Sequence, residues 1–121
     1  MAWKFDEKSP IYLQLANHIK TQIVSQEIKP GEQLPTVRDF AQQAGVNPNT
    51  MQRAFILLEQ EGMVFSKRTA GRFVTDNRDL IEKTREELAL AEMEQFVYQM
   101  MKLGFDQVSL AEILEKHLKG D

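Results

Sequence analysis

The sequence has 121 residues, of which 42% are hydrophobic, and this suits one small globular domain or one domain with an appendage. It contains no cysteine, which excludes disulfide bonds, thiolate metal sites and a cysteine nucleophile, and its formal net charge is -3. The opening residues lack a hydrophobic signal region and no apolar run is long enough to cross a bilayer, so we expect a cytoplasmic protein without a membrane partner.

The negative net charge is unevenly distributed along the chain. Residues 1–75 carry nine Lys or Arg against seven Asp or Glu, whereas residues 76–121 carry six against eleven. Local positive charge matters more for phosphate binding than the sum over the chain. The first part is therefore compatible with nucleic-acid binding, and its modest excess of positive charge favours two subunits sharing one site.

The first predicted element is a helix that starts at Ser9 and Pro10. Its apolar stripe lies at helical spacing and consists of Tyr12, Leu15, Ala16, Ile19 and Ile23. The segment before it is polar apart from Trp3 and Phe5, and it forms either a partly ordered arm or one that folds back onto the domain or a partner subunit. After Pro30 and Gly31, residues 32–34 can supply a short strand.

Two short amphipathic helices joined by a tight turn follow. Thr36 is a natural N-cap for the first, with Asp39 at capping-box spacing. Gly45 suits the left-handed conformation at the end of that helix, and Asn47 can cap the second helix with Pro48 in its first position. A turn of about three residues between two such helices predicts a helix-turn-helix.

The second helix of this pair has a polar outer face. Met51, Ala54, Phe55 and Leu58 share its core face, while amide and guanidinium side chains point away and can bind base edges. Gly62 ends the helix, and residues 63–67 and 72–75 read as two strands of a hairpin. Lys67, Arg68 and Arg72 concentrate positive charge in this hairpin, which therefore predicts a wing that contacts phosphates or the minor groove. The bland alternatives are a solvated helix face and an ordinary charged hairpin.

At this point the sequence resembles a known family. The run LPTVRDFAQQAGVNPNTMQRAFILLEQEGMV followed by GRFV looks like the winged helix-turn-helix of the GntR family of bacterial transcription regulators. The Asn-Pro-Asn-Thr version with a very short C-terminal region most resembles the YtrA-like branch. The resemblance implies DNA contacts by Arg38, Asn47, Asn49, Thr50, Gln52, Arg53, Arg68 and Thr69. Pro48 and Thr69 depart from many relatives, which have Arg and Gly there.

The remainder, residues 76–121, predicts two further helices. The first runs from about Asp79 to Leu103 without an internal Pro or Gly, and the second is expected to begin with a capping box of Ser109 and Glu112. Their apolar faces are too large for a lone hairpin to leave in water, so we expect a dimer, as the resemblance also implies. The predicted dimerisation residues are Leu88, Met93, Phe96, Val97, Met100, Leu110, Ile113 and Leu114. A ligand pocket lined by Met93, Met100 and Met101 is the alternative.

Catalysis is not expected. No nucleophile with a base and an orienting partner can be identified, and no glycine-rich phosphate loop occurs. His18 and His117 are nearly a hundred residues apart, so we expect no metal site, and no cofactor is indicated. Whether a small-molecule effector exists stays open.

We therefore predict a mainly α fold with a small β-hairpin wing, in which a winged helix-turn-helix over residues 1–75 precedes a two-helix dimerisation region over 76–121. The predicted function is that of a sequence-specific, homodimeric repressor that binds double-stranded DNA at an inverted-repeat operator. The alternative is a winged-helix module that binds another protein, because fold alone does not fix function.

Overall fold

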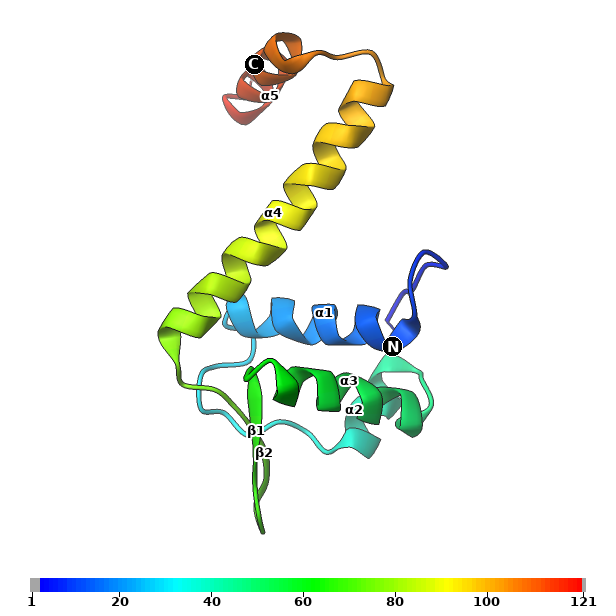
Figure 1. Ribbon diagram of the computed structural model, residues 1–121, viewed down its shortest axis with the longest axis vertical. Helices are drawn as coiled ribbons and strands as arrows, with labels where there is room; N and C mark the ends of the chain where they lie inside the picture. The colour runs from blue at the N-terminus through cyan, green and yellow to red at the C-terminus, as the bar shows by residue number, and fades with distance from the viewer. Residues whose placement is uncertain (1–2, 121) are drawn as a thin grey trace. The chain divides into compact units, whose positions relative to one another are not determined.

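The computed structural model describes residues 3–120, and these form five helices and one two-stranded antiparallel sheet (Figure 1). In chain order the elements are α1 (Ile11–Val24), α2 (Val37–Ala44), α3 (Pro48–Gln60), β1 (Val64–Lys67), β2 (Gly71–Val74), α4 (Arg78–Lys102) and α5 (Gln107–Leu118). The predicted fold class, mainly α with a β-hairpin wing, is confirmed.

The described residues divide into two compact units, one ending at Arg85 and the other beginning at Glu86, so the division lies inside α4. The functional division that we predicted after Thr75 stays a prediction, because a compact unit and a functional region need not end at the same residue.

The core of the first unit lies between α1, α2, α3 and the base of the wing. Leu15, Ile19 and Ile23 repeat along one face of α1 and are fully buried, as the predicted stripe requires. The rings of Phe40 on α2 and Phe55 on α3 meet edge to face with centroids 5.8 Å apart. Burying a side chain of this size contributes about 1.5–3 kcal/mol, so these contacts hold α3 firmly while its opposite face stays in solvent.

The start of α1 differs from the prediction by one residue. Pro10, not Ser9, occupies the N-cap position, and it makes no side-chain cap bond. The reason is that the side-chain amide of Gln14 donates to the carbonyl oxygens of Ser9 and Asp6 and accepts the backbone N–H of Asp6. Gln14 thus fixes the arm that precedes the helix.

The arm folds back onto its own domain. The backbone N–H of Trp3 donates to the carbonyl oxygen of Ala44 at the end of α2, and its indole packs against Phe40 and His18. Phe5 is half-buried against the core as well. Of the two arrangements that the sequence left open, the described residues adopt the folded-back one.

The segment before α2 lies beside the wing, as predicted for residues 32–34. Gln33 forms an antiparallel bridge with Phe73 on β2, and the backbone N–H of Leu34 donates to the carbonyl oxygen of Arg72 at 2.8 Å. The N–H of Val74 in turn donates to the carbonyl oxygen of Glu32. The wing is therefore joined to the chain that enters α2.

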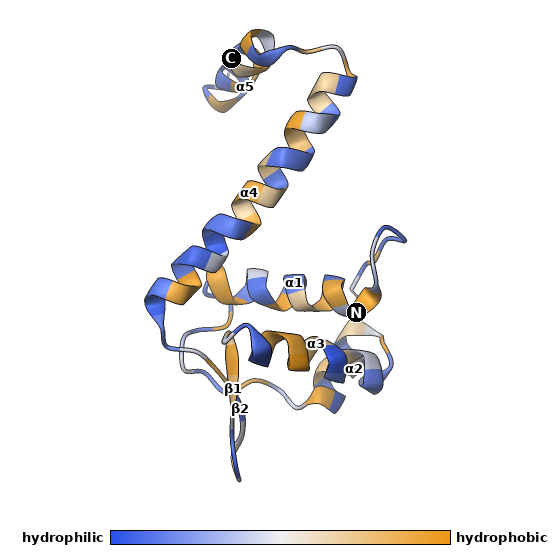
Figure 2. Cartoon of the chain, in the orientation of Figure 1, coloured by the Kyte–Doolittle hydropathy of each residue, from blue (hydrophilic) through white to orange (hydrophobic). Residues whose placement is uncertain are grey.

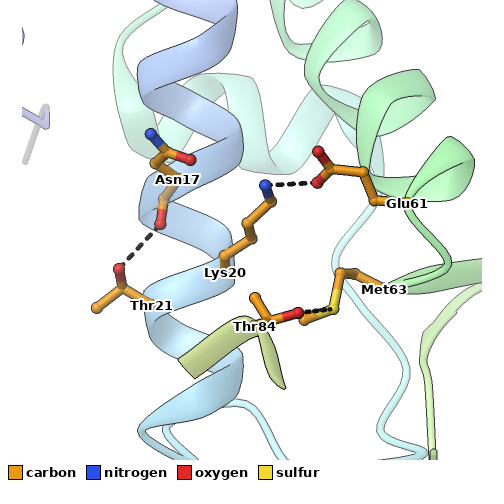
Figure 3. A network of polar contacts seen from close by, with 6 residues as sticks. All are labelled: Asn17, Lys20, Thr21, Glu61, Met63 and Thr84. Carbon is orange, nitrogen blue, oxygen red and sulfur yellow. Dashed lines mark hydrogen bonds and ion pairs between the residues drawn. The ribbon is translucent and has the colours of Figure 1, made fainter. Parts of the chain in front are cut away.

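The first turns of α4 pack on the residues that follow α3, at the edge of this core (Figure 3). The hydroxyl of Thr84 donates to the sulfur of Met63 at 3.3 Å, and both residues are buried. Beside them, Lys20 on α1 pairs with Glu61, the C-cap residue of α3. Ile81 is also buried against this core, so the beginning of α4 belongs to the first unit, which contains the wing and is called the winged unit below.

The second unit consists of the rest of α4 and of α5, along which polar and apolar residues alternate (Figure 2). Leu110 on α5 is buried in it. The predicted capping box of Ser109 and Glu112 is wrong, because Asp106 is the N-cap and Ser109 is the third helical residue of the box. The backbone N–H of Ser109 donates to the carboxylate of Asp106 and lowers the pKa of that group.

Candidate nucleic-acid interface

The helix-turn-helix begins with the capped helix α2. The hydroxyl of Thr36 accepts the backbone N–H of Asp39 at 3.1 Å, as the sequence predicts. Gly45 then adopts the left-handed conformation with φ of 74°. This conformation suits glycine because it has no Cβ, and it turns the chain sharply enough for α3 to start at Pro48.

The start of α3 is also fixed by its cap. The side-chain oxygen of Asn47 accepts the backbone N–H of Asn49 at 2.7 Å, and Pro48 occupies the first helical position. This bond uses one of the two lone pairs of the oxygen, and the amide NH₂ of Asn47 can donate to another molecule. Asn47 therefore fixes the start of α3, whether or not its side chain also contacts DNA.

The outer face of α3 is polar and open to solvent. Asn49, Arg53 and Gln60 are exposed, and Ile56 among them is 46% exposed. Gln52 and Thr50 flank this face and are half-buried. The face offers amide and guanidinium groups in the pattern that binds base edges, which is what the sequence indicated.

A cleft of about 460 Å³ lies between the start of α2, the side of α3 and the wing. Arg38 from α2, Gln52 from α3 and Arg72 from β2 all line it, together with Gln33. Three predicted DNA-binding residues from three elements thus share one hollow. The positive charge of two of them suits the passage of a phosphate backbone.

The hairpin of the wing has a simple register. Val64 pairs with Val74, Phe65 with Phe73 and Lys67 with Gly71, so residues 68–70 form the turn. The side-chain amide of Gln33 donates to the carbonyl oxygen of Ala70 and ties this turn to the segment before α2. Gly71 has φ of 103°, and a Cβ there would lie 3.1 Å from the amide nitrogen of Gln33, so both geometry and space favour glycine.

The cations of the wing fall into two kinds. Arg68 and its neighbour Thr69 are exposed at the turn. Arg72 is half-buried, forms an ion pair with Glu59 of α3 at 2.5 Å and lies over the ring of Phe55. Arg72 therefore has a role in joining the wing to α3, and less of its charge is available to DNA than that of Arg68.

Lys67 also has an intramolecular contact. Its ammonium lies 4.6 Å from the centroid of the Phe73 ring, and that ring stacks on Phe65 of the facing strand. Phe65 is 41% exposed, and this aromatic pair on the wing was missed by the sequence reasoning. The exposure of Phe65 could have been predicted, because successive side chains of a strand point to opposite faces and Phe65 follows the buried Val64.

Two further residues were missed. Tyr12 of α1 lies under the guanidinium of Arg53, with the carbon of that group 4.1 Å from the ring centroid, and Gln33 holds the wing turn. Tyr12 was assigned to the core stripe, because helical spacing alone does not separate the edge of a stripe from its centre. The contact of all these residues with DNA stays a prediction.

Four of the eight predicted dimerisation residues are exposed within one chain, and Leu88, Val97 and Met100 are half-buried. Met93, Phe96, Ile113 and Leu114 are exposed, whereas Leu110 is buried. Phe96 and Met100 line a hollow that α5 shares, and a second apolar groove is lined by Leu90, Met93, Glu94, Val97, Tyr98 and Met101. Leu90 and Tyr98 were not in the predicted set.

Within residues 3–120, no group of three or more His, Asp or Glu side chains is placed to hold a metal ion. In the same part of the chain, none of the helices has the length and apolar character needed to cross a membrane.

The comparison with known families decides the assignment. Residues 11–74, more than half of the chain, match the family described as "Bacterial regulatory proteins, gntR family". The chain belongs to this GntR family. It is therefore a transcriptional regulator with a DNA-binding domain, and the predicted resemblance is confirmed.

Individual relatives of the chain agree with this family assignment. This GntR regulator is 35% identical over 117 residues to YhcF of Bacillus subtilis (strain 168), described as an uncharacterized HTH-type transcriptional regulator, and the match covers 97% of each chain. It is 36% identical over 69 residues to the transcriptional repressor YtrA of the same organism, covering 57% of this chain and 53% of YtrA. The family and these relatives are regulators rather than enzymes, in agreement with the expected lack of catalysis.

Solved structures give the same result. A GntR family transcriptional regulator from Listeria monocytogenes matches with a TM-score of 0.82 and 33% identity, over 93% of this chain and 98% of that one. The DNA-binding domain of AraR in complex with its operator ORX1 matches with a TM-score of 0.55 and 28% identity, over 62% of this chain and 95% of that one.

Proposed function

We propose that this GntR regulator is a homodimeric repressor that binds an inverted-repeat operator, with α3 of each subunit in the major groove. The observation that carries the proposal is the exposure of Asn49 and Arg53 on the outer side of α3, next to the half-buried Gln52, which lines the cleft together with Arg38. Asn and Gln can bind adenine through two hydrogen bonds and Arg can bind guanine in the same way.

The wing supplies the second part of the interface. Arg68 at the exposed turn contacts phosphate or the minor groove beside the base pairs that α3 reads. Such contacts fix the register of the protein on the duplex but carry no base preference of their own.

Dimerisation gives the protein the two-fold symmetry that an inverted-repeat operator requires. One subunit has a small excess of positive charge in its winged part, and a helical hairpin with exposed apolar faces has too little core to be stable in isolation. Pairing of two such hairpins buries these faces and places two recognition helices on one operator. The dimer represses by occupying a promoter, and the names of two relatives, the transcriptional repressors YtrA and NagR, support repression. A transporter operon is the target that the resemblance to the YtrA-like branch suggests.

Selection of bound sequences from random duplex DNA with the purified protein tests the proposal. We expect an enriched inverted repeat. Binding titrations with the enriched duplex and a scrambled one should then show that Gln52→Ala lowers discrimination by about 1–3 kcal/mol. Gln107→Ala is the matched control, because Gln107 is an exposed amide on α5, in the second unit, and belongs to neither α3 nor the wing. Absence of any enriched sequence would favour the alternative of a protein-binding module.

A further inference from the structure

Arg53 and Arg72 both lie over an aromatic ring, but within residues 3–120 only Arg72 is also paired with a carboxylate. The guanidinium of Arg53 lies over the aromatic ring of Tyr12, which comes from the first turn of α1. A cation over a ring face is attracted by the negative charge density of that face. The contact therefore holds the end of a long side chain beside the outer face of α3.

This contact does not engage Arg53 with a hydrogen-bond acceptor atom. A guanidinium carries five N–H donors in one plane, and the centroid of the Tyr12 ring lies 4.1 Å from its central carbon. Within residues 3–120, no carboxylate or carbonyl accepts a hydrogen bond from Arg53. Arg72 shows the contrast, because its guanidinium is bound to the carboxylate of Glu59.

An arginine that is held over a ring, and whose N–H donors have no acceptor within the protein, can use those donors to bind a base. Guanine presents two acceptors, O6 and N7, to a guanidinium in the major groove. A free arginine loses much rotamer entropy when it binds them, and a side chain that is already held loses less. The ring of Tyr12 thus reduces the loss of entropy on binding without competing for the donors.

We propose that Tyr12 is a positioning residue for base recognition by Arg53, with guanine as the base recognised. This inference rests on the proposed function. Tyr12 acts through its ring face and not through its hydroxyl, so it sets the preference at the base pair that Arg53 contacts and leaves the other base pairs unaffected.

A double-mutant cycle on the selected operator tests this role. The variants are Tyr12→Phe, Tyr12→Leu, Arg53→Ala and the double variant Tyr12→Leu/Arg53→Ala, each titrated against the operator and against duplexes with one base pair changed at a time. Arg53→Ala should flatten the preference at one pair. Tyr12→Leu should reduce the preference at that same pair by about two- to fivefold, the size of a cation–π contact near a surface.

The controls separate positioning from a structural role. Tyr12→Phe keeps the ring face and should stay within about twofold of the wild type. Tyr12→Leu should have no further effect on base preference once Arg53 is Ala, since its effect is exerted through that side chain. If thermal unfolding shows that Tyr12→Leu is not folded, Tyr12→Met, which also lacks a ring face, takes its place.

Three results would overturn the inference. They are a loss in Tyr12→Phe equal to that in Tyr12→Leu, a uniform loss for all duplexes in Tyr12→Leu, and additive effects of the two positions. These are distinct from failure of the proposed function, in which the selection itself would enrich no sequence.

Discussion

The indole of Trp3 lies parallel to the imidazole of His18, with ring centroids 3.7 Å apart and an angle of 8° between the planes. The same indole meets Phe40 of α2 edge to face. One aromatic side chain therefore connects the arm before α1 to both α1 and α2. The partial burial that results lowers the pKa of His18, and the nearby Glu27 opposes this shift in part.

Stability should depend on pH through His18. Its folded-state pKa lies below the unfolded value of 6.5, so the unfolded chain binds more protons just below that pH. The contribution of the neutral His18 to the free energy of unfolding is fully present above about pH 6.5 and is lost as the pH falls toward the folded-state pKa. Urea unfolding between pH 7 and 5.5 should show this decline, and His18→Gln should make it shallower. His117→Gln is the matched control and should keep the wild-type slope; a slope unchanged in His18→Gln would contradict the assignment.

Loss of the cap on α2 should destabilise the winged unit. Thr36→Ala removes the oxygen that accepts the N–H of Asp39 and should lower the free energy of unfolding by about 1 kcal/mol. Thr36→Ser retains an oxygen at the same place and should lose much less. Urea titrations monitored by circular dichroism measure both, and equal losses would show that the methyl group, not the cap bond, stabilises the helix.

The wing should bind all DNA with little regard to sequence. Arg68→Ala should weaken binding to the selected operator and to scrambled duplex by similar factors, because a phosphate or minor-groove contact of this kind reads no base directly. The plot of log affinity against log salt should become shallower by about 0.9, the value for one phosphate contact. Lys116→Ala is the control, since Lys116 is an exposed cation on α5. A change confined to the selected operator would instead indicate base readout by Arg68.

The open groove on α4 should be the dimer contact. Met93 is 56% exposed and lines this groove, so Met93→Asp places a charge in the proposed interface without entering the hollow shared with α5. We expect sedimentation to report a monomer and operator affinity to fall at least about tenfold, because one subunit then binds alone. Gln95→Asp, on the same helix and exposed, should leave the dimer intact. A Met93→Asp protein that remained dimeric would place the interface elsewhere.

The sequence predicted the elements of the winged unit because local rules determine them. Thr36, Gly45 and Asn47 each have a role that follows from backbone geometry at one position, and the structure places each in that role. The same local rules misplaced two helix starts. At the first helix, the side-chain amide of Gln14 donates to the carbonyl oxygen of Ser9, and the helix begins one residue later than predicted. At the last helix, the carboxylate of Asp106 accepts the backbone N–H of Ser109, so Asp106 and not Ser109 is the N-cap.

The parts that sequence reasoning missed depend on contacts between distant residues. The pairing of Arg72 with Glu59 and the stacking of Arg53 on Tyr12 join residues from different elements, and no periodicity within one element indicates them. From charge alone we treated Arg68 and Arg72 as equivalent. Within residues 3–120, however, Arg72 is paired with Glu59 whereas Arg68 has no ion-pair partner.

The contact between Met63 and Thr84 has a mechanical consequence. Met63 lies between the end of α3 and the start of β1, so the hydroxyl of Thr84 connects the beginning of α4 to the segment that joins α3 to the wing. We therefore expect a displacement of the first turns of α4 to move this segment as well. Natural variants with a longer link at residues 75–77 should consequently select a different DNA sequence, even when every side chain of α3 is preserved.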